Sequence, residues 1–193
     1  MIEFKKNVKK VLTYDREQYL NFFNDESESS VVWYGVSFQL NNGGRKIGLS
    51  EFVDNYAGLF KDVVIKFDNG SDWIVNHDDK DLKWLPNDED NLTSLRTLFK
   101  YRNVPNTFKG ALIFKKDDLF EFSRDLITYP FALFYKEGLL YKNLDISHGE
   151  LQFIMKISGH MNIDFLSTNK ELLREVVNEN ASNVFNIKIY TGT

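Results

Sequence analysis

Short runs of apolar positions, or of alternating apolar and polar positions, recur along the chain and favour strands. The runs are rich in β-branched and aromatic residues, which pack well on the pleated surface of a sheet. About nine such runs are predicted as strands, at 31–40, 63–67, 72–76, 110–116, 131–135, 139–146, 151–157, 162–166 and 184–190. The sequence therefore predicts a protein built around a β-sheet.

Turns that contain glycine lie between several of these runs. Glycine adopts positive φ at no steric cost, which is why tight hairpin turns favour it. Such turns join neighbouring strands in antiparallel order. We expect hairpin turns at Asn42-Gly43, Asn69-Gly70, Glu137-Gly138 and Ser158-Gly159.

Helices are predicted where apolar residues recur at spacings of three and four. Thr168 and Glu171 have the spacing of a capping box before the last of these helices. Pro130 is expected to end the fourth, because proline cannot donate the main-chain hydrogen bond that a helix needs. The expected helices are 14–23, 51–60, 91–102, 119–127 and 172–177.

Together these elements predict an α+β fold. It consists of a mostly antiparallel sheet of hairpins with about five helices packed on it. Residues 1–193 are expected to form a single domain, because no Pro-rich or Ser-rich linker divides them. The order of strand, helix and hairpin occurs at 31–76 and again at 109–146. It fits a pseudo-repeat of two β-α-β-β units, with a chance alternation of common elements as the alternative.

Composition narrows the class of protein. The chain has 193 residues, 42% of them hydrophobic, with 28 acidic and 24 basic side chains and a net charge of -4. This weak and evenly mixed charge gives no sign of a nucleic-acid partner. The chain contains no cysteine, which excludes disulfides, zinc-thiolate sites and a thiol nucleophile. No segment has the roughly 20 apolar residues of a membrane span, and we expect a cytoplasmic protein with no membrane partner.

The stretch WIVNHDDKDLKWLP, residues 73–86, contains the first histidine of the chain beside three aspartates. A His-Asp pair is typical of one class of metal-dependent phosphohydrolase, which also needs a histidine upstream of the pair. His77 has none before it, and the spacing of the aspartates fails the pattern of a calcium-binding EF-hand loop. We therefore interpret residues 77–83 as a solvated loop between a strand and the next helix.

Other residue types that catalyse reactions occur without a supporting motif. Ser147 and His148 belong to the types of a hydrolytic triad, and acidic residues lie nearby. Neighbouring side chains on a strand point to opposite faces, so these two are not expected to hydrogen-bond to each other. Glu150, Lys156 and Asp164 lack the spacing of a nuclease site. We expect no catalytic residue, no bound metal and no cofactor.

Two functional hypotheses follow. The first is a non-catalytic protein-binding module, such as an immunity or inhibitor protein of bacterial or phage origin that blocks a toxin or a defence enzyme. Mild acidity and many Tyr and Trp residues near carboxylates favour it, because such residues form charge-complementary interfaces. The alternative is a metal-assisted hydrolase using His77, Asp78, His148, His160 and Asp164. The fold tests it, because histidines more than about 10 Å apart cannot share one metal.

The first hypothesis places a partner protein on the acidic segment between residues 78 and 90. Carboxylates steer a basic partner, and an aromatic ring supplies a desolvated anchor. The alternative is that Trp84 only fixes the loop to the core while the acids stabilise the start of a helix. The partner's identity and the oligomeric state do not follow from the sequence. The candidate docking residues are Asp78, Asp79, Asp81, Trp84, Asp88, Glu89 and Asp90.

Overall fold

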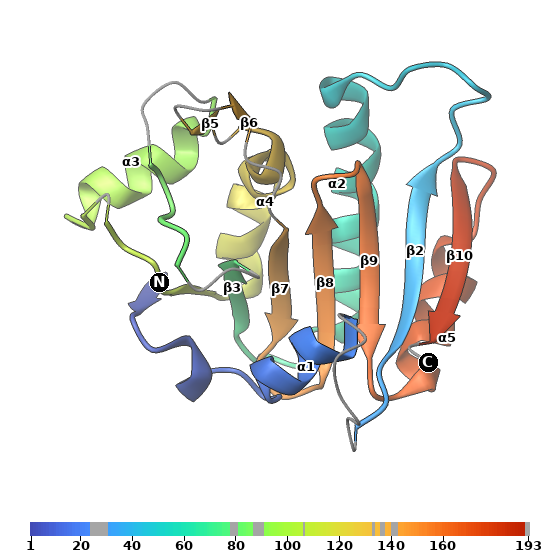
Figure 1. The fold of residues 1–193 in the computed structure, drawn as a ribbon, viewed down its shortest axis with the longest axis horizontal. Coiled ribbons are helices and arrows are strands. Elements are labelled where there is room, and N and C mark those ends of the chain that lie inside the picture. The colour runs from blue at the N-terminus through green and yellow to red at the C-terminus, as the bar shows by residue number, and fades with distance from the viewer. Residues whose placement is uncertain are drawn as a thin grey trace.

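The computed structural model describes most of the chain, with short gaps. The described residues are 1–23, 31–77, 81–86, 91–105, 107–132, 134–135, 138–139 and 143–191. Within them, one antiparallel sheet has the strand order β1-β4-β3-β7-β8-β9-β2-β10 (Figure 1). Helices pack against this sheet, and the expected α+β fold is confirmed.

Strands and helices follow one another along the described chain in a mixed order. The strands of the large sheet are β1 (Glu3–Lys5), β2 (Tyr34–Leu40), β3 (Trp73–His77), β4 (Ala111–Phe114), β7 (Leu144–His148), β8 (Phe153–Ser158), β9 (Asn162–Ser167) and β10 (Phe185–Thr191). A separate two-stranded hairpin consists of β5 (Phe134–Tyr135) and β6 (Gly138–Leu139). The helices are the 3-10 helix η1 (Val8–Lys10), α1 (Arg16–Phe23), α2 (Leu49–Phe67), α3 (Thr93–Tyr101), α4 (Lys116–Ala132) and α5 (Lys170–Asn180).

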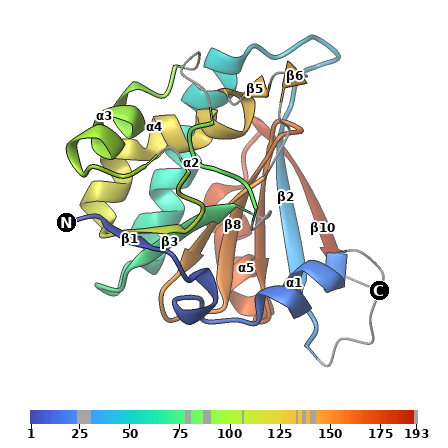
Figure 2. The same ribbon diagram turned by 60° about the vertical axis from the view of Figure 1, so that its left-hand side comes forward.

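Two layers of helix lie on opposite faces of the sheet. Figure 1 shows α2 and α4 behind the central strands and α1 in front of their lower ends, and the turned view in Figure 2 separates these layers. On β8, Phe153 and Met155 point into the main core beneath α2, α4 and α5. Ile154, between them, packs instead with Tyr19 of α1 and with Trp33. The alternation of side chains along a strand therefore produces a large core on one face and a small one on the other.

Residues 63–67, predicted as a strand, form the C-terminal end of α2. The buried stripe of this helix continues from Phe52 to Phe67 without interruption. This packing outweighs the strand preference of the β-branched residues in the segment, because propensity is weak compared with tertiary burial. The strand prediction for this segment is therefore wrong.

The predicted hairpin turns differ in their outcome. Gly43 and Gly70 have positive φ, 56° and 85°, but they lie in the links that lead into and out of α2 and not in hairpins. The segment 31–76 is therefore strand, helix, strand, and β7, β8 and β9 separate its two strands in the sheet. The first of the two predicted β-α-β-β units lacks its hairpin.

Two other predicted hairpins are present. β8 pairs with β9 around Ser158-Gly159, although the positive φ in this turn is at Met161 (61°). β5 pairs with β6 at the position of the Glu137-Gly138 turn. Glu137 itself lies outside the described residues.

The end of α4 differs from the prediction. The helix continues past Pro130 to Ala132. Pro130 is buried on this helix together with Ile127 and Tyr129. Burial of the last turn therefore offsets the main-chain hydrogen bond that the proline cannot donate.

The start of α5 also differs in detail. Asn169 is its N-cap, and its side-chain oxygen accepts a hydrogen bond from the main-chain N–H of Glu171 at 3.0 Å. Thr168 does not act as the cap, because its hydroxyl donates to the side chain of Gln152 at 2.7 Å. A cap moved by one residue still satisfies an exposed N–H group at the helix start.

Replacement of Gly70 by valine is expected to lower the free energy of unfolding by about 1–2 kcal/mol. An added Cβ would meet no atom within 4 Å, so the cost comes from the positive φ alone. Chemical denaturation measures it. Gly58→Val in the exposed middle of α2 is the control, since valine there also meets open space and is no worse a helix residue than glycine. Equal denaturation midpoints for the two variants would contradict the expected strain.

Candidate functional site

A row of polar side chains crosses the face of the sheet opposite α2 and α4. On β9, Ile163 and Phe165 point into the main core, so Asn162 and Asp164 point to the other face. No described element lies in front of the upper parts of β9, β2 and β10 in Figure 1. We call this surface the Asp164 face, and it consists of Ser37, Lys156, Asn162, Asp164, Lys188 and Tyr190.

Strand register aligns these side chains directly across the sheet. Lys156 on β8 lies opposite Asp164 on β9, and Asp164 lies opposite Ser37 on β2. Ser37 in turn lies opposite Lys188 on the last strand, β10. Directly opposed side chains of an antiparallel pair have Cβ atoms about 5 Å apart. The row therefore places one carboxylate between two ammonium groups.

Asp164 occupies the centre of this face and is half-buried. The side-chain amide of Asn162 donates to its Oδ1 at 2.6 Å and to the hydroxyl of Ser37 at 3.1 Å. Burial raises the pKa of the Asp164 carboxyl above its usual value, and the hydrogen bonds from Ser37 and Asn162 and the charge of Lys156 offset only part of that effect. The carboxylate is therefore held in place but incompletely compensated.

Aromatic rings border the row on the side nearest α1. The ring of Tyr190 lies over Gly35, where an added Cβ would be 2.3 Å from the ring carbon Cζ. Burial, and then the charge of Asp164, raise the pKa of the Tyr190 hydroxyl. The ammonium of Lys156 lies 5.6 Å from the centre of the Tyr19 ring. Glycine at position 35 thus makes room for the tyrosine ring beside the carboxylate.

The row continues under α1, where it is closed to solvent. Asp145 on β7 lies opposite both Lys156 and Asn76 and is buried. The hydroxyl of Tyr19 donates to its Oδ1 at 3.4 Å. Burial raises the pKa of the Tyr14 hydroxyl well above its usual value, and the nearby charge of Asp145 raises it further. Only the part of the row around Asp164 is therefore open to a partner.

His77 is a buried strand residue, and its assignment to a solvated loop is wrong. It ends β3, and its ring lies against those of Trp84 and Tyr129. The hydroxyl of Tyr129 donates to the main-chain oxygen of Trp84. Because its proton is used in that bond, the Tyr129 hydroxyl accepts a hydrogen bond from Nε2–H of His77, with an N–O distance of 2.7 Å. The aromatic contacts that enclose this ring come from later segments of the chain.

His148 has a structural role in the turn between β7 and β8. Its Nδ1 accepts hydrogen bonds from the main-chain N–H groups of Glu150 and Leu151, both at 3.0 Å. Its Nε2 therefore carries the proton and donates to the main-chain oxygen of Phe67 at 3.0 Å. Ser147 bonds instead to the main-chain oxygen of Ile74 at 3.3 Å. As expected from strand geometry, the two neighbours do not form a nucleophile-base pair.

The histidines proposed for a metal-assisted hydrolase do not lie together. Trp73 is opposite His148 in the sheet and His77 is opposite Leu144, so the two histidines are about 13 Å apart along the strands. His160 lies in the exposed turn after β8. In the part of the chain that the structure describes, no group of three His, Cys, Asp or Glu residues is placed to hold a metal ion. Asp78 lies outside that part.

The acidic docking segment predicted from sequence is only partly described. Trp84 has 0% of its surface exposed, and its Nε1 donates to the main-chain oxygen of Gly110 at 2.8 Å. It fixes the loop to the core, and its suggested role as a surface anchor is corrected. Asp81 is exposed and lies 3.7 Å from the ammonium of Lys109. A docking role for the remaining residues stays a prediction, since they lie outside the described residues: Asp78, Asp79, Asp88, Glu89 and Asp90.

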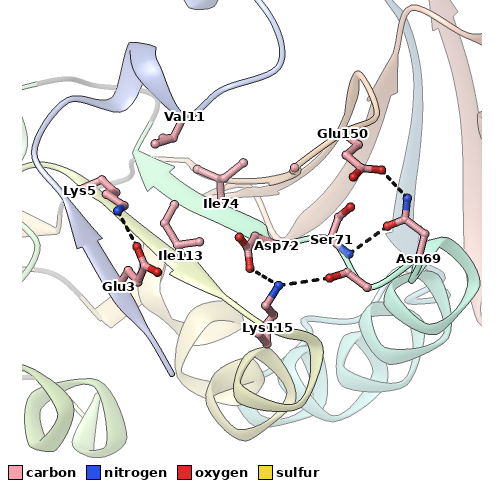
Figure 3. Close-up of a pocket in the computed structure, with 12 residues that line it drawn as sticks. Glu3, Lys5, Val11, Asn69, Ser71, Asp72, Ile74, Ile113, Lys115 and Glu150 are labelled. Carbon is pink, nitrogen blue, oxygen red and sulfur yellow. Dashed lines mark hydrogen bonds and ion pairs between the residues drawn. The ribbon is translucent and has the colours of Figure 1, made fainter.

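A cavity of about 570 Å³ opens on the same face of the sheet at the opposite end, beside β1, β3 and β4 (Figure 3). Ile74, Ile113 and Val11 form its apolar part. The polar groups around it bind one another: Lys5 to Glu3 at 2.5 Å, Lys115 to Asp72 at 2.8 Å and Asn69 to Glu150 at 2.7 Å. The last two contacts connect the α2–β3 link with the β4–α4 link and the β7–β8 turn, which gives these polar groups a structural role.

Sequence reasoning missed the Asp164 face. It considered Lys156 and Asp164 together only in a nuclease pattern with Glu150, which lies at the other end of β8 in the β7–β8 turn. Asp164 was otherwise considered only as a candidate metal ligand. The β8–β9 hairpin was the available signal, because residues at equal distances from a turn face each other across it. The pair Ser158 and Asn162 closes that turn, and Lys156 opposite Asp164 is the next pair on the same face.

Comparison with known proteins gives no family for this chain. No family model matches it, and no curated protein or solved structure is significantly similar. Among the described residues, no helix combines the length and apolar character needed to cross a membrane. The function is therefore argued from the surface described above.

Proposed function

We propose that the chain is a non-catalytic protein-binding module that docks its partner on the Asp164 face. An immunity or inhibitor protein of bacterial or phage origin, which blocks a toxin or a defence enzyme, is the type of module we propose. The observation that carries the proposal is the half-buried carboxylate of Asp164 at the centre of an otherwise open sheet face.

The environment of Asp164 favours a basic side chain of the partner. Burial already disfavours the charged carboxylate, as its raised pKa indicates. A guanidinium or ammonium group placed on it forms a charge-assisted hydrogen bond away from bulk water, where such bonds are strong. Tyr190 beside it is of the residue type that anchors interfaces. A basic partner is therefore the expected class.

The flanking lysines supply specificity. Lys156 and Lys188 lie on either side of the Asp164 and Ser37 pair in the row. A partner with several adjacent basic groups would be repelled by them, whereas one basic group flanked by acidic groups would match the row. Such a pattern of attraction and repulsion discriminates between partners more sharply than attraction alone.

Affinity capture from the source organism, followed by reconstitution with the purified partner, tests this proposal. Asp164→Asn is expected to weaken binding by about tenfold or more, which is about 1.4 kcal/mol. It is expected to leave the free energy of unfolding unchanged or slightly higher, because the charged form is disfavoured by burial. Asp62→Asn, an exposed carboxylate on α2, is the matched control and should change neither quantity.

Two results would contradict the proposal. Equal dissociation constants of the reconstituted complex for wild type and Asp164→Asn would show that the Asp164 face is not the docking surface. The purified chain could instead turn over a substrate and lose this activity when residues of this face are substituted. That result would show that the face serves catalysis and not the binding of a partner. Carbon NMR of the Asp164 carboxyl gives a further check, because its pKa should fall when a basic partner group binds it.

A further inference from the structure

One edge of the sheet is open along a full-length strand. Among the described strands, β10 is the last in the sheet order and pairs only with β2. Figure 1 shows no described strand beyond it, and the link from α5 runs beside its upper end. β1, at the opposite edge, has only three residues, whereas β10 has seven. An open strand of this length is a template for a further strand.

The register fixes which main-chain groups of β10 point outward. Leu40 lies opposite Phe185, and the N–H of Asn41 donates to the oxygen of Val184 at 2.8 Å. Hydrogen-bonded and non-hydrogen-bonded pairs alternate along an antiparallel ladder. The residues with even numbers therefore bond to β2. The main-chain groups of Ile187 and Ile189 point to the open edge. Of Phe185 only the oxygen is available there, because its N–H donates to the oxygen of Ser182 at 3.3 Å.

The side chains of the same three residues lie on the face covered by the helices. Ile189 has 75% of its surface exposed there, whereas α5 packs on the neighbouring strands β2 and β9. A groove of about 520 Å³ remains between α5 and β10. Its apolar lining includes Tyr34, Val36, Leu173 and Val177 as well as Ile189. An added strand would thus find both main-chain partners and apolar surface.

We propose that the occupant of this edge is a second copy of the chain, paired antiparallel through β10 about a two-fold axis at Ile187. In this register Ile187 faces Ile187 of the second copy, and Phe185 faces Ile189 of the second copy. All these pairs are apolar, lie on the groove side and are of the hydrogen-bonded kind. On the other face, Lys188 is opposite Asn186 of the second copy.

Charge selects this register over its neighbour. An axis at Lys188 would place two ammonium groups directly opposite each other, which destabilises a strand pair. An axis at Ile189 would leave Phe185 beyond the paired part of the strand. The axis at Ile187 avoids both and leaves the Asp164 face of each copy open, so the dimer goes beyond the proposed docking function and does not depend on it.

Sedimentation velocity of the purified full chain tests the dimer. We expect a reversible monomer-dimer equilibrium with a dissociation constant of about 1–100 μM, as for small interfaces. Ile189→Lys should weaken it by about tenfold or more. Ile65→Lys is the matched control, because Ile65 is a 52% exposed isoleucine on α2. It should leave the dissociation constant unchanged.

Single cysteines test the register, since the chain has none of its own. Ile187→Cys should form a disulfide-linked dimer on mild oxidation, because opposed residues of a hydrogen-bonded pair have Cα atoms about 5.5 Å apart, within the range of a disulfide. Val184→Cys, in the residue just before β10 and distant from its own equivalent in this register, should crosslink at least about tenfold more slowly. Circular dichroism confirms that both variants are folded.

Three results would overturn the proposal. The chain alone could sediment as a monomer at every concentration up to about 500 μM, as it would if a strand of a different protein occupied the edge. Ile189→Lys and Ile65→Lys could weaken the dimer equally. Val184→Cys could form crosslinked dimers as fast as Ile187→Cys, which would place the axis elsewhere. None of these results depends on whether Asp164 binds a partner.

Discussion

Trp84→Ala is expected to lower the free energy of unfolding by about 3–5 kcal/mol. The indole is fully buried and lies against the rings of His77, Phe99 and Tyr129. Alanine would leave a cavity among these rings and deprive the main-chain oxygen of Gly110 of its hydrogen-bond donor. The loop that Trp84 fixes would then lose its main attachment to the core.

Chemical denaturation measures this loss, and two further variants separate its causes. Trp84→Phe keeps a six-membered aromatic ring and removes the five-membered ring with its N–H, so we expect a smaller loss of about 1–2 kcal/mol. Tyr101→Ala, at a residue that is 79% exposed on α3, should change the free energy by less than about 0.5 kcal/mol. If Trp84 were instead an exposed docking anchor, Trp84→Ala would unfold at nearly the same denaturant concentration as wild type.

Local patterns predicted those elements in which the burial of one face decides the structure. On β9 the polar residues Asn162 and Asp164 alternate with the buried residues Ile163 and Phe165, and a shift by one residue would expose these core side chains. The amphipathic spacing of α2 was equally clear. Its last turns were misassigned because valine and isoleucine in 63–67 favour strands locally, while their burial continues the helix stripe from Phe52.

The Asp164 face could not be predicted in the same way, because its residues meet only through the strand order. The hairpin alone relates Lys156 to Asp164. Ser37 joins them because β2 pairs with β9, and Lys188 because β10 pairs with β2. No turn or spacing in the sequence specifies these long-range pairings, which depend on how α2 and α5 pack against the sheet.

His77 illustrates the same limit for a buried polar group. Its neighbours in sequence are aspartates, which favour a solvated loop. Its hydrogen-bond partner is Tyr129, which lies on α4 and 52 residues away. A buried histidine needs such a partner, and the sequence gives no sign of which residue supplies it.

His148 is expected to make stability fall as the pH decreases below about 6.5. Burial is the largest influence on its pKa and lowers it below the ordinary value, although the Phe67 carbonyl and the charges of Glu150 and Asp68 act in the opposite direction. The unfolded chain therefore takes up the proton first. The stabilising contribution is complete above the unfolded pKa, and it is lost as the pH falls from that value towards the folded pKa.

The hydrogen bonds of His148 explain why the neutral ring is needed. Protonation would place an N–H at Nδ1, facing the N–H groups of Glu150 and Leu151 that now donate to it. His148→Leu would remove the titration, but it would leave those two donors and the oxygen of Phe67 without their partner. We therefore expect this variant to lose about 2–4 kcal/mol at neutral pH.

Urea denaturation at pH values of about 7.5 and about 5.5 tests both parts of this prediction. Wild type should lose stability between the two values. His148→Leu should be less stable at the higher pH and lose less on acidification. Asp164 acts in the opposite sense, because its raised pKa makes the folded chain take up that proton more readily. A loss on acidification that is the same in wild type and His148→Leu would show that the proton is taken up at another residue.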